Sequence, residues 1–535
     1  MSKFNSASRL ASVVNRPDVI KNLAGGVAFE MDAKTRLYKK VCNCLLSDTY
    51  YQKNTETLAG IIRDIKQVAA IDPEFILKLA AYARNEMYLR SIPIVLLGEA
   101  AAINECKPFV RKWVPRILKR ADEPAELVAY WVSKHGDIGD KGQAGGTHAF
   151  PNSLKKGISD VLNTFGEYHF LKYDRSKSVK IKDVIRVCRA KPSDVLHDAI
   201  FKYMCHDIEN DDVMVLHKAH KEFAKIDNFE EARHLIRAGD MTWEMAVSKF
   251  GNKPEVWDEL NLPFMAMLRN IRNIINADAK CIGSVIERLK DPNQVLRSKQ
   301  LPFRFYSAYR EMESLIGTNP NISKVLAALS EAISISVQNV PMLEGITLLA
   351  ADNSGSMSQA VSERSKVSCA NIANLLCAMA HGFCESSIVG AFGTDWCPVN
   401  LNPADSIFTN MNRIARADTK GMSTNAYRVV EELLKKKTFA DRIFIFSDEQ
   451  CYGVTAWGYG GGSRKALADL LKDYRRTINP DIKLYTIDLS SYGTTPVPMD
   501  EPNVYRIAGW SEKIFDFVKT CEVNNTNVLE TINRY

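Results

Sequence analysis

The spacing of apolar residues divides this chain into two parts with different patterns. From residue 34 to residue 335, apolar positions recur with a helical period in short segments, which Pro, Gly, Asn or Asp residues separate. Asp72-Pro73-Glu74 is typical of a helix start, because Asp can cap, Pro suits the first turn and Glu favours the helix dipole. Other amphipathic helices are predicted near 55–70, 109–121, 124–135, 153–165, 192–205, 213–225, 254–275, 279–290 and 321–335.

So many short helices in succession indicate stacked helical pairs, as in a solenoid of HEAT type. The letters themselves show no clean repeat, so an irregular helical domain is the alternative. In both cases residues 1–340 are predicted to be an all-α domain.

Near residue 340 the helical pattern gives way to short, continuous apolar runs. Four of them are predicted to be buried strands: 345–351, 387–392, 442–447 and 482–487. Helical stretches lie between them, notably at 367–384 and 426–437. Buried strands that alternate with helices predict a parallel, doubly wound α/β sheet, here over residues 341–535.

Oxygen-bearing side chains follow the ends of three of these strands. Asp352, Ser354 and Ser356 come directly after the first strand, Thr424 lies at a later helix start, and Asp448 ends the third strand. In open α/β sheets ligands bind beyond the carboxyl ends of the strands. Hard oxygen ligands suit a divalent cation such as Mg²⁺, so a magnesium site is predicted here.

This set of residues resembles the metal-ion-dependent adhesion site of von Willebrand A-type domains. The resemblance implies that Asp352, Ser354, Ser356, Thr424 and Asp448 surround one cation, with Ser423 as a rival for the role of Thr424. Ordinary turn residues without a metal are the alternative, because Asp, Ser and Gly populate turns anyway. Asp395 and Glu449 are the nearest candidates for a base and no nucleophile is evident, so the site is predicted to bind and not to catalyse.

Charge separates the two parts as well. Residues 341–535 hold 20 Lys and Arg against 22 Asp and Glu, a net charge of −2, and the whole chain carries +7, so residues 1–340 carry +9. A basic region favours a polyanionic partner such as nucleic acid. The twelve scattered cysteines are expected to be reduced and mostly buried, and His217 and His220 to be surface residues.

Two basic clusters are candidates for contacts with RNA phosphates. On a helical wheel over 109–120, the apolar residues occupy one half. The other half holds the cations Arg111, Lys112, Arg116, Lys119 and Arg120. The second cluster is Lys172, Arg175, Lys177, Lys180, Lys182, Arg186, Arg189 and Lys191, with Tyr168, His169 and Tyr173 available for stacking or sugar contacts. For each cluster, a solvated helix face is the alternative.

A helical repeat domain followed by an A-type domain resembles the Ro autoantigen family, whose helical module is called TROVE. The segments that carry the resemblance span nearly the whole chain: Arg36–Tyr38, Thr49–Tyr51, Leu171–Tyr173, Asp183–Arg186, Lys191–Ser193, Val256–Trp257, Leu262–Pro263, Leu268–Asn270 and Leu301–Phe303. The resemblance implies that the helices close into a ring and that Lys172 and neighbouring cations bind small non-coding Y-like RNA. Ser176 stands where a family member can have Arg, and Arg189 where a His can occur.

The resemblance further implies that ends of misfolded RNAs enter the ring and that an exoribonuclease is a possible partner. The leading hypothesis is therefore a ribonucleoprotein component in RNA quality control that is not an enzyme. The alternative is a cation-dependent protein-interaction scaffold without RNA. A nucleotide-binding enzyme is disfavoured, because the glycine-rich run 458–465 lacks phosphate-loop spacing. A monomeric protein in the cytoplasm, without a membrane segment, is expected.

Overall fold

The computed structural model describes residues 16–44, 52–136, 150–174, 177–300, 302–337, 340, 342–361, 365–451, 466–510, 513–524 and 527–535. They form two compact units, which are discontinuous in sequence. The first comprises Met1–Asp64, Lys299–Arg310 and Leu329–Arg534, and the second Ile65–Ser298, Glu311–Ala328 and Tyr535. The glycine-rich run 458–465 and Arg175 lie outside the described residues.

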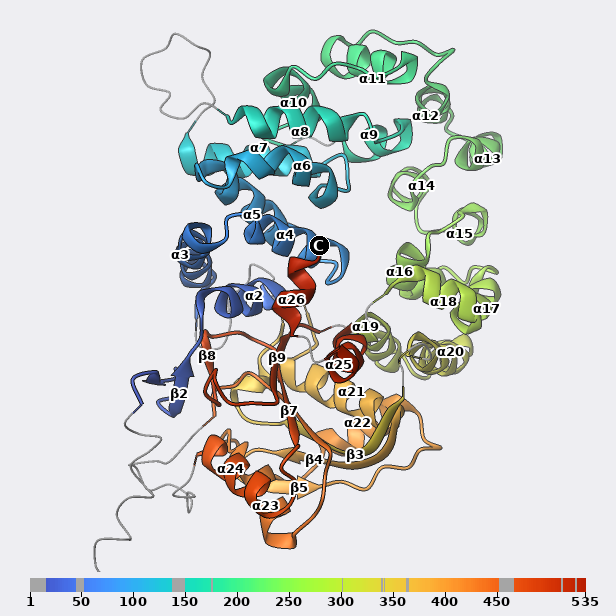
Figure 1. Ribbon diagram of the computed structural model, residues 1–535. Helices are drawn as coiled ribbons and strands as arrows, with labels where there is room; N and C mark the ends of the chain where they lie inside the picture. The colour runs from blue at the N-terminus through green and yellow to red at the C-terminus, as the bar shows by residue number, and fades with distance from the viewer. Residues whose placement is uncertain are drawn as a thin grey trace, which may run out of the picture. The chain divides into compact units, whose positions relative to one another are not determined.

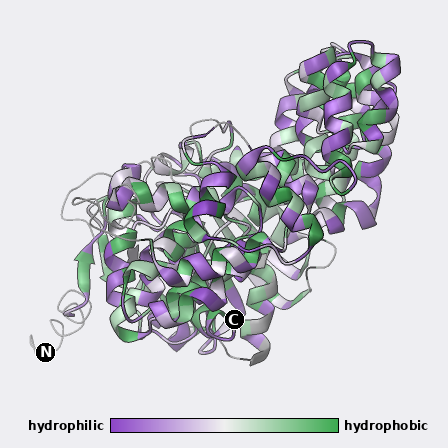
Figure 2. Ribbon diagram, turned by 90° about the horizontal axis from the view of Figure 1, so that it is seen from above, coloured by the Kyte–Doolittle hydropathy of each residue, from purple (hydrophilic) through white to green (hydrophobic). Residues whose placement is uncertain are grey.

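The second unit is built from helices that pack against their neighbours in the chain (Figure 1). Their bounds are α3 Asn54–Ile71 (from Ile65), α4 Phe75–Asn85, α5 Ser91–Ala102, α6 Lys107–Ile117, α7 Glu123–His135, α8 Asn152–Leu162, α9 Glu167–Tyr173, α10 Ile181–Cys188, α11 Val195–His206, α12 Val215–Lys225, α13 Phe229–Ala238, α14 Trp243–Phe250, α15 Pro254–Glu259, α16 Phe264–Asn276, α17 Ile282–Lys290 and α18 Pro292–Ser298. The prediction of a helical domain is confirmed. Figure 2 shows hydrophobic and hydrophilic positions alternating along many of the helices, which gives those helices one face to bury, whereas α5 is buried along nearly its whole length.

Helix α6 illustrates how the apolar pattern is used. Val110, Trp113, Val114 and Ile117 are buried on it, and the cations lie on the opposite side. The division of the predicted wheel is thus confirmed up to Ile117. The helix ends there, and Lys119 and Arg120 belong to the turn before α7.

Two predictions within the second unit are wrong. The single helix predicted over 254–275 is two helices, α15 and α16, separated by an extended segment before Pro263. Proline disfavours helical backbone at the residue before it, which explains the break. His217 is also buried rather than on the surface, with its ring centroid 4.1 Å from that of Tyr203.

The first unit contains a six-stranded sheet in the order β5-β4-β3-β6-β7-β9. Its strands are β3 Leu343–Asp352, β4 Cys384–Phe392, β5 Trp396–Pro398, β6 Arg442–Ser447, β7 Lys483–Asp488 and β9 Val504–Ala508. All neighbours are parallel except the pair of β4 with β5. The predicted doubly wound sheet is confirmed. The helix predicted over 367–384 ends at His381, and Cys384 already belongs to β4.

Helices cover both faces of this sheet (Figure 1). The first unit contains α19 Pro302–Glu313 as far as Arg310 and α20 Asn321–Ser336 from Leu329 on. Its further helices in this part of the chain are α21 Cys369–His381, α22 Ile407–Ala415, α23 Tyr427–Lys436, α24 Leu467–Thr477, α25 Lys513–Asn524 and α26 Val528–Asn533. Ile443 and Ile445 of β6 share one core with α23 and α24. Phe444 and Phe446 point to the other face, where Phe515 of α25 contacts both rings. This alternation is that of a strand buried on both sides.

The first unit also includes an N-terminal segment, which was predicted to belong to the helical domain. It consists of β1 Val19–Lys21, β2 Val27–Glu30 and α2 Ala33–Asn43. Strand β2 pairs with β8 Thr494–Thr495, and Phe29 is fully buried in the core beside the sheet. A division at residue 340 therefore separates segments that pack in one core.

All twelve cysteines are free and eight of them are buried, as predicted. Of the described helices, none combines the length and the apolar content that a membrane crossing needs.

Candidate cation centre and nucleic-acid interface

The candidate cation centre lies where the order of the sheet reverses. Strand β3 has β4 on one side and β6 on the other: after β3 the chain crosses to β4 and β5, and after β5 it crosses back to β6 on the opposite side. The loops behind β3 and β6 then meet at one carboxyl edge, with Asp352 ending the first strand and Asp448 following the second. Ligands of doubly wound sheets bind at such a switch point.

The first loop is folded tightly around the carboxylate of Asp352, which is fully buried. Its Oδ1 accepts a hydrogen bond from the Ser354 N–H at 2.8 Å, and its Oδ2 accepts one from the Ser447 hydroxyl at 2.5 Å. The hydroxyl oxygens of Ser354 and Ser356 are 3.5 Å apart, and both residues are buried. The structure thus gathers one carboxylate and two hydroxyls, as predicted from their spacing.

The second loop approaches the first through its backbone. The Gly355 N–H donates to the Met422 carbonyl at 2.9 Å, which brings Ser423 and Thr424 to the same edge. Thr424 is buried, with 2% of its surface exposed, whereas Ser423 is half-buried and its N–H donates to Thr394 Oγ1 at 3.3 Å. Burial favours Thr424 over Ser423 as the candidate ligand from this loop. That the Thr424 hydroxyl binds a cation stays a prediction.

The third loop supplies an oxygen atom without a partner. Asp448 Oδ1 accepts a hydrogen bond from the Gln450 N–H at 3.0 Å, whereas Oδ2 is buried and has no hydrogen-bond partner among the described residues. Burial raises the pKa of Asp352 and of Asp448, and the charge of Asp352 raises that of Asp448 further. An unsatisfied buried carboxylate oxygen beside a second carboxylate fits a cation, which would offset the cost of burying both.

The chemistry of this donor set is that of a hard cation. Among the described residues, no group of three or more His, Cys, Asp or Glu side chains is arranged so that it could hold a metal ion. A cation at this centre would therefore have two carboxylates and the rest of its ligands from hydroxyls and water, which suits Mg²⁺. The residues fit the predicted ion.

One charged group beside the centre was not predicted. The ammonium of Lys39, on α2, is fully buried and forms ion pairs with Glu449 and with Asp488 Oδ2, the latter at 2.8 Å. Glu449 is therefore occupied and is no free base, while Asp395 is largely exposed. No sequence pattern marks Lys39, because its partners lie more than 400 positions away.

The basic candidates of α6 lie on the surface of the second unit, and acidic or aromatic side chains accompany them. Arg111 forms an exposed ion pair with Asp160 at 2.9 Å, and the guanidinium of Arg116 lies 4.9 Å from the Trp113 ring centroid. Such exposed pairs contribute little to stability and can open for another anion.

One cation of each basic cluster lies against tyrosine rings, in a group that we call the basic–aromatic cluster: Arg120, Tyr168, Lys172 and Tyr173. The Arg120 guanidinium lies 4.4 Å from the Tyr173 ring centroid, and Lys172 Nζ lies 5.7 Å from it. The Lys172 ammonium also donates to the Tyr168 hydroxyl at 2.7 Å. The two predicted clusters thus meet at Tyr173, which sequence position alone did not indicate.

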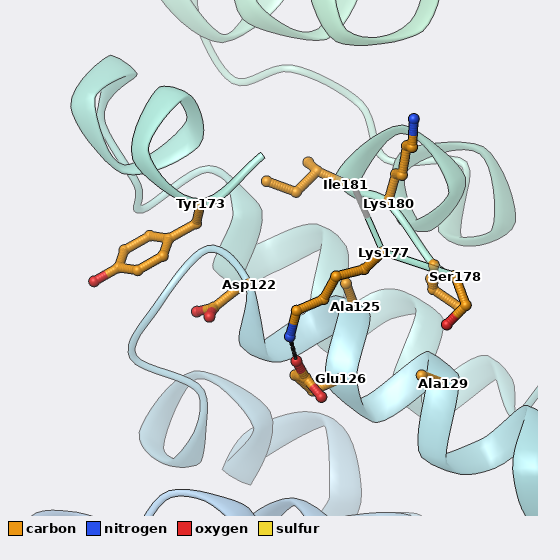
Figure 3. Close-up of a pocket in the computed structure, with 10 residues that line it drawn as sticks. Asp122, Ala125, Glu126, Ala129, Tyr173, Lys177, Ser178, Lys180 and Ile181 are labelled. Atoms are coloured by element: carbon orange, nitrogen blue, oxygen red, sulfur yellow. Dashed lines mark hydrogen bonds and ion pairs between the residues drawn. The ribbon is translucent and has the colours of Figure 1, made fainter. Parts of the chain in front are cut away.

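A small pocket borders this cluster between α7 and the segment before α10. Figure 3 shows Tyr173 and Asp122 at one end of it, and Lys177 reaching across to Glu126, with which it forms an ion pair. Asp122 pairs with Arg120 at 2.6 Å. The pocket walls are thus of mixed charge.

The remaining basic candidates differ in whether their charged groups have partners within the protein. The Arg186 guanidinium donates to the Cys205 carbonyl at 2.6 Å. Arg189 and Lys191 are exposed, and neither forms an ion pair within the described residues. Arg189 ends α10 in the left-handed region, with a φ of 50°.

Two arginines that were not predicted adjoin the basic–aromatic cluster. Burial and the positive charges of Arg120 and Arg84 lower the pKa of Arg90. Arg84 pairs with Glu123 at 2.9 Å, whose other oxygen accepts the backbone N–H groups of Lys119 and Arg120. The positive charges around Arg90 would be relieved by a polyanionic ligand.

Family models match both parts of this chain. The TROVE domain matches residues 21–236 and 233–319, and the Ro60 vWA domain matches residues 347–520. The chain belongs to the TROVE family. Members of this family are RNA-binding proteins, and the vWA match fits the Ro branch with its C-terminal A-type domain.

Among curated relatives, the telomerase protein component 1 of Rattus norvegicus and that of Mus musculus are each 25% identical over 342 residues, or 53% of this chain. The match spans only 13% of the length of those relatives. The crystal structure of the Deinococcus radiodurans Ro (RSR) protein is similar over 90% of this chain and 97% of that one, with a TM-score of 0.63 and 16% identity. This likeness confirms the fold.

Proposed function

We propose that this TROVE-family protein binds small, structured non-coding RNA of the Y-like class through the second unit, as a ribonucleoprotein component in RNA quality control. The observation that carries the proposal is the basic–aromatic cluster with the exposed cations Arg189 and Lys191 near it in sequence. Ammonium and guanidinium groups would bind phosphates, and Tyr168 and Tyr173 offer surfaces for sugars or unstacked bases. Capture of misfolded RNA ends and cooperation with an exoribonuclease belong to the same proposal.

Filter binding of a structured small RNA at graded salt tests this proposal. Because phosphate contacts release counterions, the affinity should fall steeply with salt. The double variant Lys172→Glu/Arg189→Glu should bind at least about tenfold more weakly and show a shallower salt dependence, by about one contact per cation removed. The matched control is Lys280→Glu, which reverses an exposed cation in the turn before α17 and should bind as the wild type does.

Micromolar or weaker affinity for every RNA tested, unchanged in the double variant, would overturn the RNA proposal. The absorbance of the purified protein at 260 nm adds a simple check, since co-purified RNA raises it. A clean protein spectrum together with weak affinity would favour a protein-interaction scaffold.

We propose further that the first unit holds Mg²⁺ through Asp352, Ser354, Ser356, Thr424 and Asp448. The unpartnered Asp448 Oδ2 supports this assignment. With only two carboxylates around it, the ion would keep part of its positive charge and could accept an anionic side chain of a partner. The chain itself would position the ion, and water would complete its coordination.

A further inference from the structure

The N-terminal segment contacts the third loop of the candidate cation centre at three consecutive residues, Glu449, Gln450 and Cys451. The Lys39 ammonium is paired with Glu449. The Leu23 N–H donates to Gln450 Oε1 at 2.8 Å, and Asn22 Nδ2 donates to the Cys451 carbonyl at 2.7 Å. All these contacts lie within the first unit.

Of the three N-terminal residues that make these contacts, Lys39 is the charged one, and it is enclosed between two buried carboxylates. Its side chain has no exposed surface, and those of Glu449 and Asp488 are 2% and 1% exposed. Asp488 Oδ1 in turn accepts the backbone N–H groups of Ser490 and Ser491, at 3.0 and 2.7 Å. The ammonium therefore bridges the loop that follows β6 and the end of β7.

The loop that Lys39 holds has an unfavourable backbone conformation next to a candidate ligand. Glu449 has a φ of 58°, in the left-handed region that non-glycine residues rarely adopt, and it directly follows Asp448. The Glu449 N–H donates to Ser447 Oγ at 3.0 Å, and Ser447 donates to Asp352 Oδ2 at 2.5 Å. Such a conformation persists only when its surroundings fix it, and the Lys39 pair is one of the contacts that do so.

We propose that Lys39 is a positioning residue of the cation centre: by bridging Glu449 and Asp488 it fixes the turn that presents Asp448 to the ion. The inference rests on the proposed cation centre and is independent of the RNA proposal. It makes a segment near the N-terminus a functional part of the A-type domain.

Removal of Lys39 should change the affinity for a divalent cation in two ways that have opposite signs, and the experiment must separate them. Loss of a positive charge would attract a cation more strongly, whereas loss of the bridge would let Asp448 move. The double variant Lys39→Met/Glu449→Gln removes one positive and one negative charge, so it removes the bridge at constant net charge. The matched control is Lys40→Met, because Lys40 adjoins Lys39 on α2, is also buried, and pairs with Asp64 at 2.7 Å instead of with the third loop.

The full-length protein is titrated with Mn²⁺, and free Mn²⁺ is measured from its electron paramagnetic resonance signal. Substitution of a residue that orients a metal ligand typically lowers the metal affinity 10–100-fold. Lys39→Met and the double variant should therefore each bind Mn²⁺ about tenfold more weakly. Lys40→Met should bind it as the wild type does, although it too is expected to be less stable. Urea unfolding is measured once with Mn²⁺ and once with a chelator, which separates stability from affinity. The added resistance that Mn²⁺ gives should be reduced in the Lys39 variants and unchanged in Lys40→Met.

Tighter Mn²⁺ binding by Lys39→Met, with wild-type affinity in the double variant, would show that charge alone matters and would overturn the inference. If the Lys39 variants do not fold, Asn22→Ala decides, since it removes the bond to the Cys451 carbonyl; several-fold weaker binding supports the inference and unchanged binding overturns it. A wild-type protein that binds no Mn²⁺ overturns both this inference and the cation centre, and leaves the RNA proposal to its own titration.

Discussion

His217 shows at the residue scale how tertiary packing reverses an expectation from sequence. It was expected on the surface with His220, but it is 5% exposed, and Nδ1 is buried without a hydrogen-bond partner among the described residues. Its backbone N–H donates to the Glu167 carboxylate at 2.6 Å. Burial lowers the pKa of His217 below its usual range, so the folded protein favours the neutral ring.

We predict that His217 makes the second unit less stable in acid. Because the folded-state pKa lies below the unfolded value of about 6.5, the neutral ring's contribution is complete above that pH and is lost as the pH falls through the folded-state pKa. In His217→Phe, the urea midpoint should therefore fall less between pH 7.5 and pH 5 than in the wild type. His234→Gln, at an exposed position, is the control. An equal fall in all three proteins would contradict the prediction.

At the scale of elements, long amphipathic helices were predictable because their period repeats several times, and the central strands because each is a continuous apolar run. Short strands were not, and β5, β8 and β9 have two to five residues each. Helices pack closely where a glycine allows it, and this too depends on tertiary contacts. A methyl group at Gly157 of α8 would lie 2.7 Å from Val114 of α6.

We predict opposite effects of alanine at two helical glycines. Gly157→Ala should destabilise the second unit by about 1–3 kcal/mol, because the contact with Val114 outweighs the helix propensity of alanine. Gly283→Ala, in α17, meets no atom within 4 Å and should stabilise by about 0.5–1 kcal/mol. Equilibrium urea unfolding measures both. If Gly157→Ala were as stable as Gly283→Ala, α6 and α8 would not be as close as described.

At the scale of the whole molecule, the A-type domain is not built from residues 341–535 alone. The N-terminal segment contributes β2 to the sheet with β8, Phe29 to the core and Lys39 to the buried ion pairs with Glu449 and Asp488. Tyr38 adds two hydrogen bonds with the backbone of Ala508. None of these contacts follows from a pattern within either segment.

A protein consisting of residues 341–535 should consequently be much less stable than the same region in the full chain. Without Lys39, Glu449 and Asp488 lose their counter-ion in a buried site, which by itself costs about 3–5 kcal/mol when one partner of such a pair is removed. Hydrogen exchange of β6 and β7 amides, measured in both proteins, tests this. Addition of residues 1–64 as a separate chain should restore part of the protection. Equal protection without them would contradict the prediction.

The sequence by itself determined the two fold classes, the positions of the long helices and central strands, and the loops that carry Asp352 and Asp448. These features depend on local periodicity and on the rule that strand ends meet at one edge of a sheet. Only the tertiary structure decided that Arg120 and Lys172 share the Tyr173 ring, that His217 is buried, and that Lys39 holds the third loop. Such contacts join residues tens to hundreds of positions apart, and each depends on burial and charge compensation that no local pattern records.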